Sequence, residues 1–234
     1  MRRRIWRALS VRGGEAIFED RADAGRRLAE RLAPMRGEDP IVLALPRGGV
    51  PVGVEISRAL GAPLDVLISR KLGAPDQPEL GIGAVAQGGT RVLNEDIVQQ
   101  IGIPDEYIEE ITHRELAEVE RRLRILRGDR PEPEVRDRTA ILVDDGLATG
   151  VTARAAVRAL RERNPRRLVL AVPVCPPRTA RLLAPEVDRL ICLRTPEDFV
   201  AVGLWYRDFE QVTDDEVVEL LEKARRERGA QEPQ

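Results

Sequence analysis

The stretch ILVDDGLATGVTARAAV, residues 141–157, decides the fold. The apolar run 140–143 predicts a buried strand, and the spacing of apolar residues predicts a helix over about 152–164. Between them stand two adjacent aspartates, Asp144 and Asp145, followed by a run of small residues. A strand, a glycine-bearing loop and a helix in this order predict a βα unit whose loop opens at the carboxyl edge of a sheet.

Further βα units are predicted on both sides of this stretch. Short apolar runs indicate buried strands, and glycine or proline residues punctuate the helical segments between them. Two strand-like pieces around Gly88 and Gly89 predict a hairpin. The strand-like runs are PIVLALP, PLDVLISRKLG, RRLVLAVPVCPP and VDRLICLRTP. Alternating strands and helices predict an α/β fold with a doubly wound, mainly parallel sheet.

Composition narrows the class of protein. The chain has 234 residues, of which 42% are hydrophobic and 33% charged, and its net charge is −2. These values predict a soluble, cytoplasmic globular protein, and the near-neutral charge gives no indication of nucleic-acid binding. No apolar run reaches the length of a membrane span. The basic start of the chain lacks the apolar core of a signal peptide.

Two loops carry residues suited to a sugar phosphate. In the loop 144–152, the small residues let backbone N–H groups approach an anion, and the following helix adds the positive end of its dipole. A second glycine loop, LPRGGVP (45–51), also follows a strand. Carboxylates repel a bare phosphate, but they suit the diol of a sugar or a hydrated Mg²⁺. We therefore expect Asp144 and Asp145 to meet hydroxyl groups while the small residues hold a phosphate.

These motifs together resemble the type I phosphoribosyltransferase family. The stretch 141–157 is similar to its phosphoribosyl-diphosphate signature, and LPRGGVPVGVEISRALG is similar to its pyrophosphate loop and the helix after it. The resemblance extends over residues 18–213. It is strongest to a bacterial group with the motifs LPRGGVPVG, RKLG, PELGIGAV and VDDGLATG, for which the sequence defines no acceptor.

The resemblance implies a role for each matching residue. The ribose hydroxyls would meet Asp144 and Asp145, which would also hold Mg²⁺ directly or through water. The 5-phosphate would be bound by Ala148, Thr149, Gly150, Val151 and Thr152. The pyrophosphate would be bound by Arg47, Gly48 and Gly49, in a loop that often contains a strained peptide bond in this family.

The family also has a flexible loop that closes over the site, and residues 70–83 match it. The resemblance makes Arg70 and Lys71 catalytic candidates that neutralise the departing pyrophosphate. Only two of the 38 basic residues are lysines, Lys71 and Lys223, so a lysine at position 71 is more informative than another arginine would be. The alternative is a solvated pair of cations at the end of a strand.

The implied reaction is a Mg²⁺-dependent transfer of ribose 5-phosphate from phosphoribosyl diphosphate to a nitrogen acceptor, with release of pyrophosphate. The enzyme would be a glycosyltransferase of nucleotide salvage, and the acceptor a nucleobase. A hood over the base is expected within 176–212, with Phe199, Trp205 and Tyr206 as base-stacking candidates. These aromatic residues equally suit the core or a dimer interface. Ala148 stands where 6-oxopurine enzymes carry aspartate, which resembles the adenine and uracil enzymes instead.

Two alternatives remain open. The first is a non-catalytic regulatory protein that binds phosphoribosyl diphosphate, and the second is a phosphatase or pyrophosphokinase on a similar fold. The resemblance implies a homodimer. We expect a frayed N-terminus over 1–17, one domain over 18–222 and a polar C-terminal tail over 223–234.

Overall fold

The computed structural model describes residues 17–230, so that the expected frayed start falls, apart from residue 17, outside the described residues. Its centre is a five-stranded sheet in which every pair of neighbours is parallel. In their order across the sheet, the strands are β2 (Leu64–Val66), β1 (Pro40–Ala44), β6 (Thr139–Val143), β7 (Arg167–Val174) and β8 (Arg189–Arg194). The predicted doubly wound α/β fold is confirmed.

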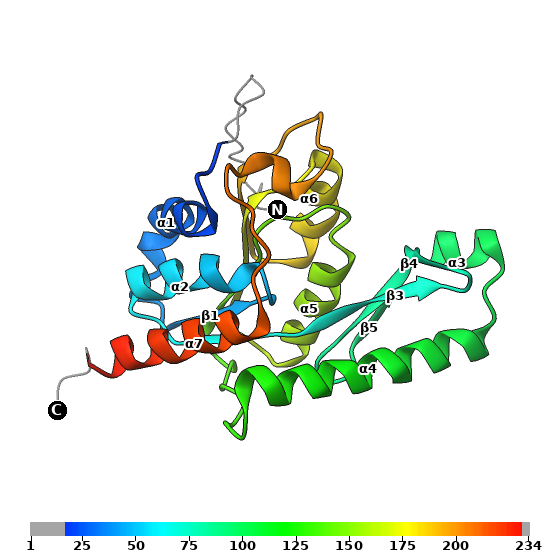
Figure 1. Cartoon of the computed structure of the whole chain (residues 1–234), viewed down its shortest axis with the longest axis horizontal. Coiled ribbons are helices and arrows are strands. Elements are labelled where there is room, and N and C mark those ends of the chain that lie inside the picture. The colour runs from blue at the N-terminus through cyan, green and yellow to red at the C-terminus, as the bar shows by residue number, and fades with distance from the viewer. Residues whose placement is uncertain (1–16, 231–234) are drawn as a thin grey trace.

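Helices cover both faces of the sheet and produce three layers (Figure 1). Alternate residues of a strand point to opposite faces, so both faces of a buried strand must be apolar. On β1, Val42 and Ala44 belong to one hydrophobic cluster while Ile41 and Leu43 belong to the other. The first face is covered by α1 (Arg21–Leu32), α2 (Gly49–Leu60) and α7 (Asp214–Gly229), the second by α5 (Val151–Glu162) and α6 (Pro177–Leu183).

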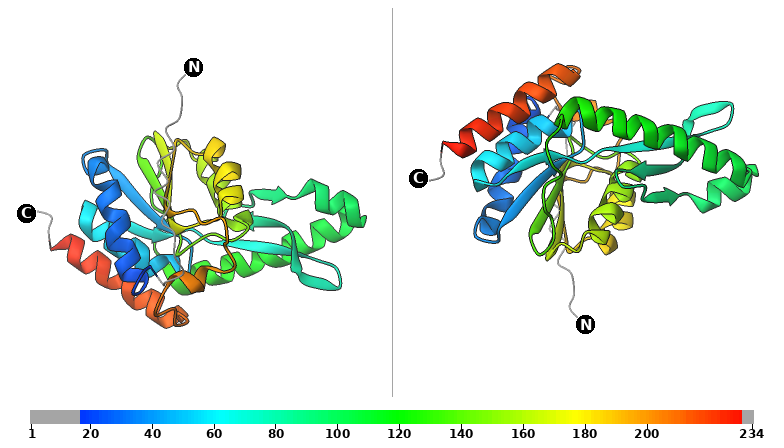
Figure 2. Two further views of the ribbon diagram at one scale, coloured as in Figure 1. Left: turned by 90° about the horizontal axis from the view of Figure 1, so that it is seen from above. Right: turned by 90° about the horizontal axis from the view of Figure 1, so that it is seen from below.

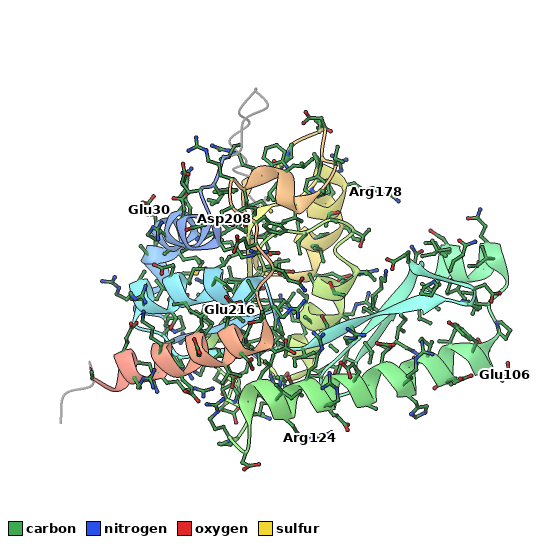
Figure 3. The ribbon with its side chains drawn as sticks, in the orientation of Figure 1. Glu30, Glu106, Arg124, Arg178, Asp208 and Glu216 are labelled. Carbon is green, nitrogen blue, oxygen red and sulfur yellow. The ribbon has the colours of Figure 1, made fainter. Side chains whose placement is uncertain are left out.

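A second, antiparallel sheet forms an arm that projects from this body, as all three views show (Figures 1 and 2). Its elements are β3 (Ser69–Ala74), β4 (Gln77–Ala86), β5 (Arg91–Leu93), α3 (Glu95–Ile101) and α4 (Asp105–Arg127). Glu106, in the first turn of α4, lies at the far end of the arm, whereas Arg124 lies near the body (Figure 3). The arm has a hydrophobic cluster of its own between its strands and α4.

The arm is anchored to the central sheet by a buried ion pair. Asp65 on β2 and Arg127 at the end of α4 are both under 10% exposed, and Arg127 Nε lies 3.2 Å from Asp65 Oδ2. The same guanidinium donates a hydrogen bond to the carbonyl oxygen of Val66. Because each charge depends on the other for compensation, this pair fixes where α4 leaves the sheet.

One boundary differs from the prediction. The run 63–73 was expected to be one strand, but it divides into β2 in the central sheet and β3 in the arm. Helix α7 continues to Gly229 and includes the first residues of the polar C-terminal segment. Short 3₁₀ turns complete the chain: η1 (Ala33–Met35), η2 (Ala184–Glu186) and η3 (Val202–Trp205). No helix within residues 17–230 combines the length and hydropathy needed to cross a bilayer.

Candidate functional site

The two predicted loops begin side by side, at the carboxyl ends of β1 and β6. These strands are neighbours, with Ala44 paired to Val143, and the N–H of Leu45 donates to the carbonyl oxygen of Val143 over 2.9 Å. From β1 the chain continues to β2 on one side, while β6, β7 and β8 lie on the other. Such a point of reversal in a parallel sheet opens the crevice in which ligands bind.

Glycines at positions 48 and 49 let these loops touch. A β-carbon on Gly48 would lie 1.9 Å from Oδ2 of Asp145, which no real side chain tolerates. A β-carbon on Gly49 would lie 2.8 Å from the carbonyl oxygen of Val143 and 3.0 Å from Cα of Asp144. Each aspartate of the pair therefore lies against one glycine of the first loop. The structure brings together the residues predicted for the sugar and for the pyrophosphate.

The first loop ends in the start of a helix. Helix α2 begins at Gly49, and its first two N–H groups already donate hydrogen bonds within the loop, that of Gly49 to the carbonyl oxygen of Leu45 and that of Val50 to the carbonyl oxygen of Arg47. Arg47 is half-buried, and its nearest guanidinium nitrogen lies 3.9 Å from Oδ1 of Asp214, at the start of α7. The peptide bond between Pro46 and Arg47 is cis.

The second loop is held by the elements around it. The N–H of Leu147 donates to the carbonyl oxygen of Val174, and the hydroxyl of Thr179 on α6 donates to the carbonyl oxygen of Ala148 over 2.6 Å. Gly150 has φ +74°, and a β-carbon there would lie 2.6 Å from Thr179 Cγ2, so this position requires glycine. Ala148 and the residue after it are exposed in front of the start of α5. The five residues predicted for the 5-phosphate thus form one exposed turn and the first positions of a helix.

The two aspartates differ in their surroundings. Oδ2 of Asp145 accepts a hydrogen bond from Nε of Arg21 over 2.8 Å, while Oδ1 of Asp144 accepts one from the N–H of Asp145 over 2.9 Å. Burial, reinforced by the charge of Asp145, raises the pKa of Asp144 well above its usual range. Burial also raises the pKa of Asp145, and the guanidinium of Arg21 opposes that rise. Two carboxyl groups that resist ionisation gain most from a ligand that donates hydrogen bonds or carries positive charge.

Arg21 is the residue of this site that sequence reasoning missed. It begins α1, more than 120 positions before its partner, and its guanidinium lies 3.9 Å from the ring centroid of Phe209. Nothing in the sequence distinguishes Arg21 from the many other arginines of the chain. Its role is visible only once the fold has brought the start of α1 to the end of β6.

The segment 70–83, predicted as a flexible loop, lies within the hairpin formed by β3 and β4 of the arm. Arg70 pairs with Glu115 of α4 at 2.9 Å, and Nζ of Lys71 lies 3.2 Å from the carboxylate of Glu79. The two cations therefore point in different directions, as neighbours on a strand must.

Strand register places the two cations on opposite faces of the hairpin. Arg70 is opposite Val85, which belongs to the cluster between the arm strands and α4. Lys71 is opposite Ala84, which packs with Val151 at the start of α5. Cross-strand partners share a face of the sheet. Lys71 therefore lies on the face of the hairpin that packs against the phosphate-loop helix, and Arg70 does not.

The three aromatic candidates for base stacking differ in their burial. Tyr206 is 5% exposed, its ring lies between those of Phe18 and Phe209, and its hydroxyl donates to the carbonyl oxygen of Asp145. A ring in that position is part of the packing, so the prediction that Tyr206 stacks on a base is wrong. Phe199 and Trp205 are half-buried and keep an exposed portion.

The donor set at the aspartates fits the predicted Mg²⁺. Mg²⁺ prefers hard oxygen ligands, and it is commonly held by one or two carboxylates, several waters and the phosphates of a substrate. Asp144 and Asp145 supply two such carboxylates at the start of the loop predicted to bind the 5-phosphate. In the part of the chain that the structure describes, no cluster of three or more His, Cys, Asp or Glu residues forms an all-protein metal cage.

Comparisons with a family model, with curated proteins and with solved structures all relate the chain to known proteins. A family model described as the phosphoribosyl transferase domain matches residues 14–206. Two proteins of Mycobacterium tuberculosis, from strains CDC 1551 and H37Rv, are 46% identical over 90% of the chain, and their names assign them provisionally as phosphoribosyl transferases. The chain spans 48% of the length of these relatives. The crystal structure of TT1426 from Thermus thermophilus is 42% identical, with a TM-score of 0.76 over 88% of this chain and 98% of that one.

Proposed function

Because the chain belongs to the phosphoribosyl transferase domain family, we propose that it transfers ribose 5-phosphate from phosphoribosyl diphosphate to a nitrogen acceptor and releases pyrophosphate. One observation carries the proposal: Gly48 and Gly49 lie directly against Asp145 and Asp144 at the reversal point of the sheet. The residues predicted to bind the diol, the 5-phosphate and the pyrophosphate thereby meet at one edge of the sheet.

Each group has a task in that arrangement. The carboxylates of Asp144 and Asp145 accept hydrogen bonds from the ribose hydroxyls, and the loop 148–152 with the start of α5 holds the 5-phosphate. The loop 47–49 with the start of α2 holds the pyrophosphate. As the acceptor nitrogen bonds to C1 of the ribose, the bond from C1 to the pyrophosphate oxygen breaks. Fixed geometry and charge compensation at the leaving group are the protein's main contributions.

Mg²⁺ supplies charge neutralisation at the pyrophosphate when it is bound. Asp144 and Asp145 would hold it, directly or through water. Lys71 adds a positive charge on the face of the hairpin that packs against α5. Arg70 stabilises the hairpin against α4 through Glu115 and is assigned no role at the leaving group.

The acceptor we propose is a nucleobase, which gives the chain a place in nucleotide salvage. Phe199 and Trp205 keep exposed ring surface in the hood segment and are the remaining base-stacking candidates. Ala148 is exposed at the phosphate loop and offers no carboxylate to a purine ring nitrogen. This favours adenine-type or uracil-type acceptors over 6-oxopurines.

The proposal is tested by measuring pyrophosphate release from phosphoribosyl diphosphate and Mg²⁺ across a panel of nucleobases, with the Asp144→Asn/Asp145→Asn double variant as the inactive control. Release that depends on one base and on the two aspartates supports the transferase. Binding of phosphoribosyl diphosphate without release for any base contradicts it and favours the regulatory alternative.

A further inference from the structure

Arg21 is held from three sides at the end of β6. Its Nε donates to Asp145 Oδ2 over 2.8 Å, and a terminal guanidinium nitrogen donates to the carbonyl oxygen of Glu210 over 2.8 Å. The same guanidinium lies over the ring of Phe209 at 3.9 Å. The side chains of Arg21 and Asp145 are 11% and 15% exposed, so water screens this pair less than it screens a surface pair.

Asp145 is in turn confined between two groups. Arg21 holds Oδ2 on one side, and on the other the α-carbon of Gly48 leaves no room for even a methyl group. A charge-assisted hydrogen bond combined with a steric limit gives the carboxylate one orientation. Its main chain is fixed too, because the hydroxyl of Tyr206 donates to its carbonyl oxygen.

Asp144 has no comparable support. Within residues 17–230 no arginine, lysine or histidine forms an ion pair with it, and its Oδ1 accepts the N–H of Asp145. The carboxylate of Asp144 is therefore oriented by the main-chain N–H beside it, whereas Arg21 orients the carboxylate of Asp145. The two aspartates therefore differ: the carboxylate of Asp145 is held by an ion pair with Arg21, and the carboxylate of Asp144 is more available to a ligand.

The contacts of Arg21 connect the site to a distant segment. Phe209 and Glu210 belong to the segment 205–210, called the strap here, which leads from η3 toward the start of α7. Asp208, labelled in Figure 3, lies in the same strap. The strap is tied to the start of the domain by main-chain hydrogen bonds from Arg207 to Phe18 and from Asp208 to Glu19. The start of α1, which carries Arg21, and the strap that Arg21 contacts are therefore held together.

We propose that Arg21 is a positioning residue, which orients the carboxylate of Asp145 for the ribose diol. This inference rests on the proposed function, because the diol belongs to phosphoribosyl diphosphate. Arg21 compensates the charge of Asp145, and its side-chain hydrogen bonds go to Asp145 and Glu210 rather than to the residues 47–49 assigned to the pyrophosphate. Its loss should weaken binding of the sugar part of the substrate and leave binding of pyrophosphate intact.

The test is calorimetric titration of wild type and Arg21→Met with phosphoribosyl diphosphate and, separately, with pyrophosphate, both in Mg²⁺. We expect Arg21→Met to bind phosphoribosyl diphosphate at least about tenfold more weakly, as for loss of a hydrogen bond between charged groups, with pyrophosphate affinity unchanged. Arg21→Lys should recover part of the loss, because it restores the charge but not the planar fork over Phe209.

Arg207→Met is the matched control, because Arg207 lies in the same strap but pairs with Glu19 on the surface. It should bind both ligands as wild type does. If Arg21→Met does not fold, Phe209→Leu, which keeps the ion pair but removes the ring beneath it, should show a smaller loss confined to phosphoribosyl diphosphate.

The outcomes separate the two claims. A wild type that binds no phosphoribosyl diphosphate overturns the proposed function. The positioning role is overturned if the wild type binds phosphoribosyl diphosphate and Arg21→Met binds it equally well. It is also overturned if Arg21→Met loses affinity for phosphoribosyl diphosphate and for pyrophosphate to the same extent. Either result leaves the proposed function standing.

Discussion

The α-carbon of Gly48 lies directly against the carboxylate of Asp145, so that a β-carbon at position 48 would fall 1.9 Å from Oδ2. The backbone of Gly48 is ordinary, with φ −61° and ψ −30°, so glycine is needed there for space and not for conformation. This contact joins the two ligand loops of the site, and it predicts what a single methyl group would do.

Gly48→Ala should lower the affinity for phosphoribosyl diphosphate by about fivefold or more, since overpacking of this kind costs about 1–3 kcal/mol. The added methyl group must displace either the first loop or the carboxylate of Asp145. Calorimetry measures the loss. Gly37→Ala is the control, because a β-carbon at Gly37 meets nothing within 4 Å. A Gly48→Ala variant with wild-type affinity would show that the two loops do not act together.

Lys71→Met should lower kcat roughly 100-fold, because it removes the positive charge that we assign to the leaving group. Arg70→Met should affect kcat much less, since Arg70 points to Glu115 on the opposite face of the hairpin. Steady-state kinetics on both variants makes the comparison. Equal losses in kcat would contradict the assignment of faces from strand register.

Asp144→Asn should raise the melting temperature of the ligand-free protein at pH 7 while it abolishes ligand binding. Burial and the charge of Asp145 raise the pKa of Asp144, so the folded state binds more protons than the unfolded state above the ordinary carboxyl pKa of about 4. The free energy of unfolding of the wild type therefore falls as pH rises from that ordinary pKa up to the raised one. The variant lacks this fall.

Thermal melts from pH 4 to pH 8 measure that difference. The two proteins should converge at the acid end, where Asp144 is neutral in both. A variant less stable than wild type at pH 7 would show that the ionised Asp144 is satisfied within the protein and carries no cost that a ligand relieves.

Asp65→Asn should lower the free energy of unfolding by about 3–5 kcal/mol, because it leaves the charge of Arg127 buried without compensation. Glu109→Gln is the matched control: Glu109 of α4 pairs with Arg91 of the arm strand β5, but it is exposed, and its loss should cost at most about 1 kcal/mol. Denaturant titration compares them. Equal small effects would show that the pair of Asp65 and Arg127 does not anchor the arm.

Much of this site could be predicted from the sequence because its key features are local. A strand, two aspartates and a small-residue loop stand within 141–157, and the glycine loop after β1 needs only the rule on carboxyl edges to be placed beside them. The features that could not be predicted are contacts between distant segments. The run 63–73 has no glycine or proline between its two ends, so its division between two sheets follows from packing alone.

The same limit explains Tyr206 and Arg21. From sequence alone, an aromatic residue near a predicted hood suits stacking on a base as well as it suits burial. Only the contact between the rings of Phe18 and Tyr206 shows that Tyr206 is packed in the protein. Arg21 reaches Asp145 across more than 120 residues of sequence. In an arginine-rich chain, the sequence does not show which carboxylate a given arginine pairs with until the fold is known.

The central claim is that Asp144 and Asp145 bind the ribose of phosphoribosyl diphosphate between two anion loops. Calorimetric titration with phosphoribosyl diphosphate and Mg²⁺ tests it most directly, on wild type and on the Asp144→Asn/Asp145→Asn variant. We predict saturable binding to the wild type and none to the variant at the same concentrations. Absence of binding to the wild type, or equal binding to both proteins, would contradict the claim.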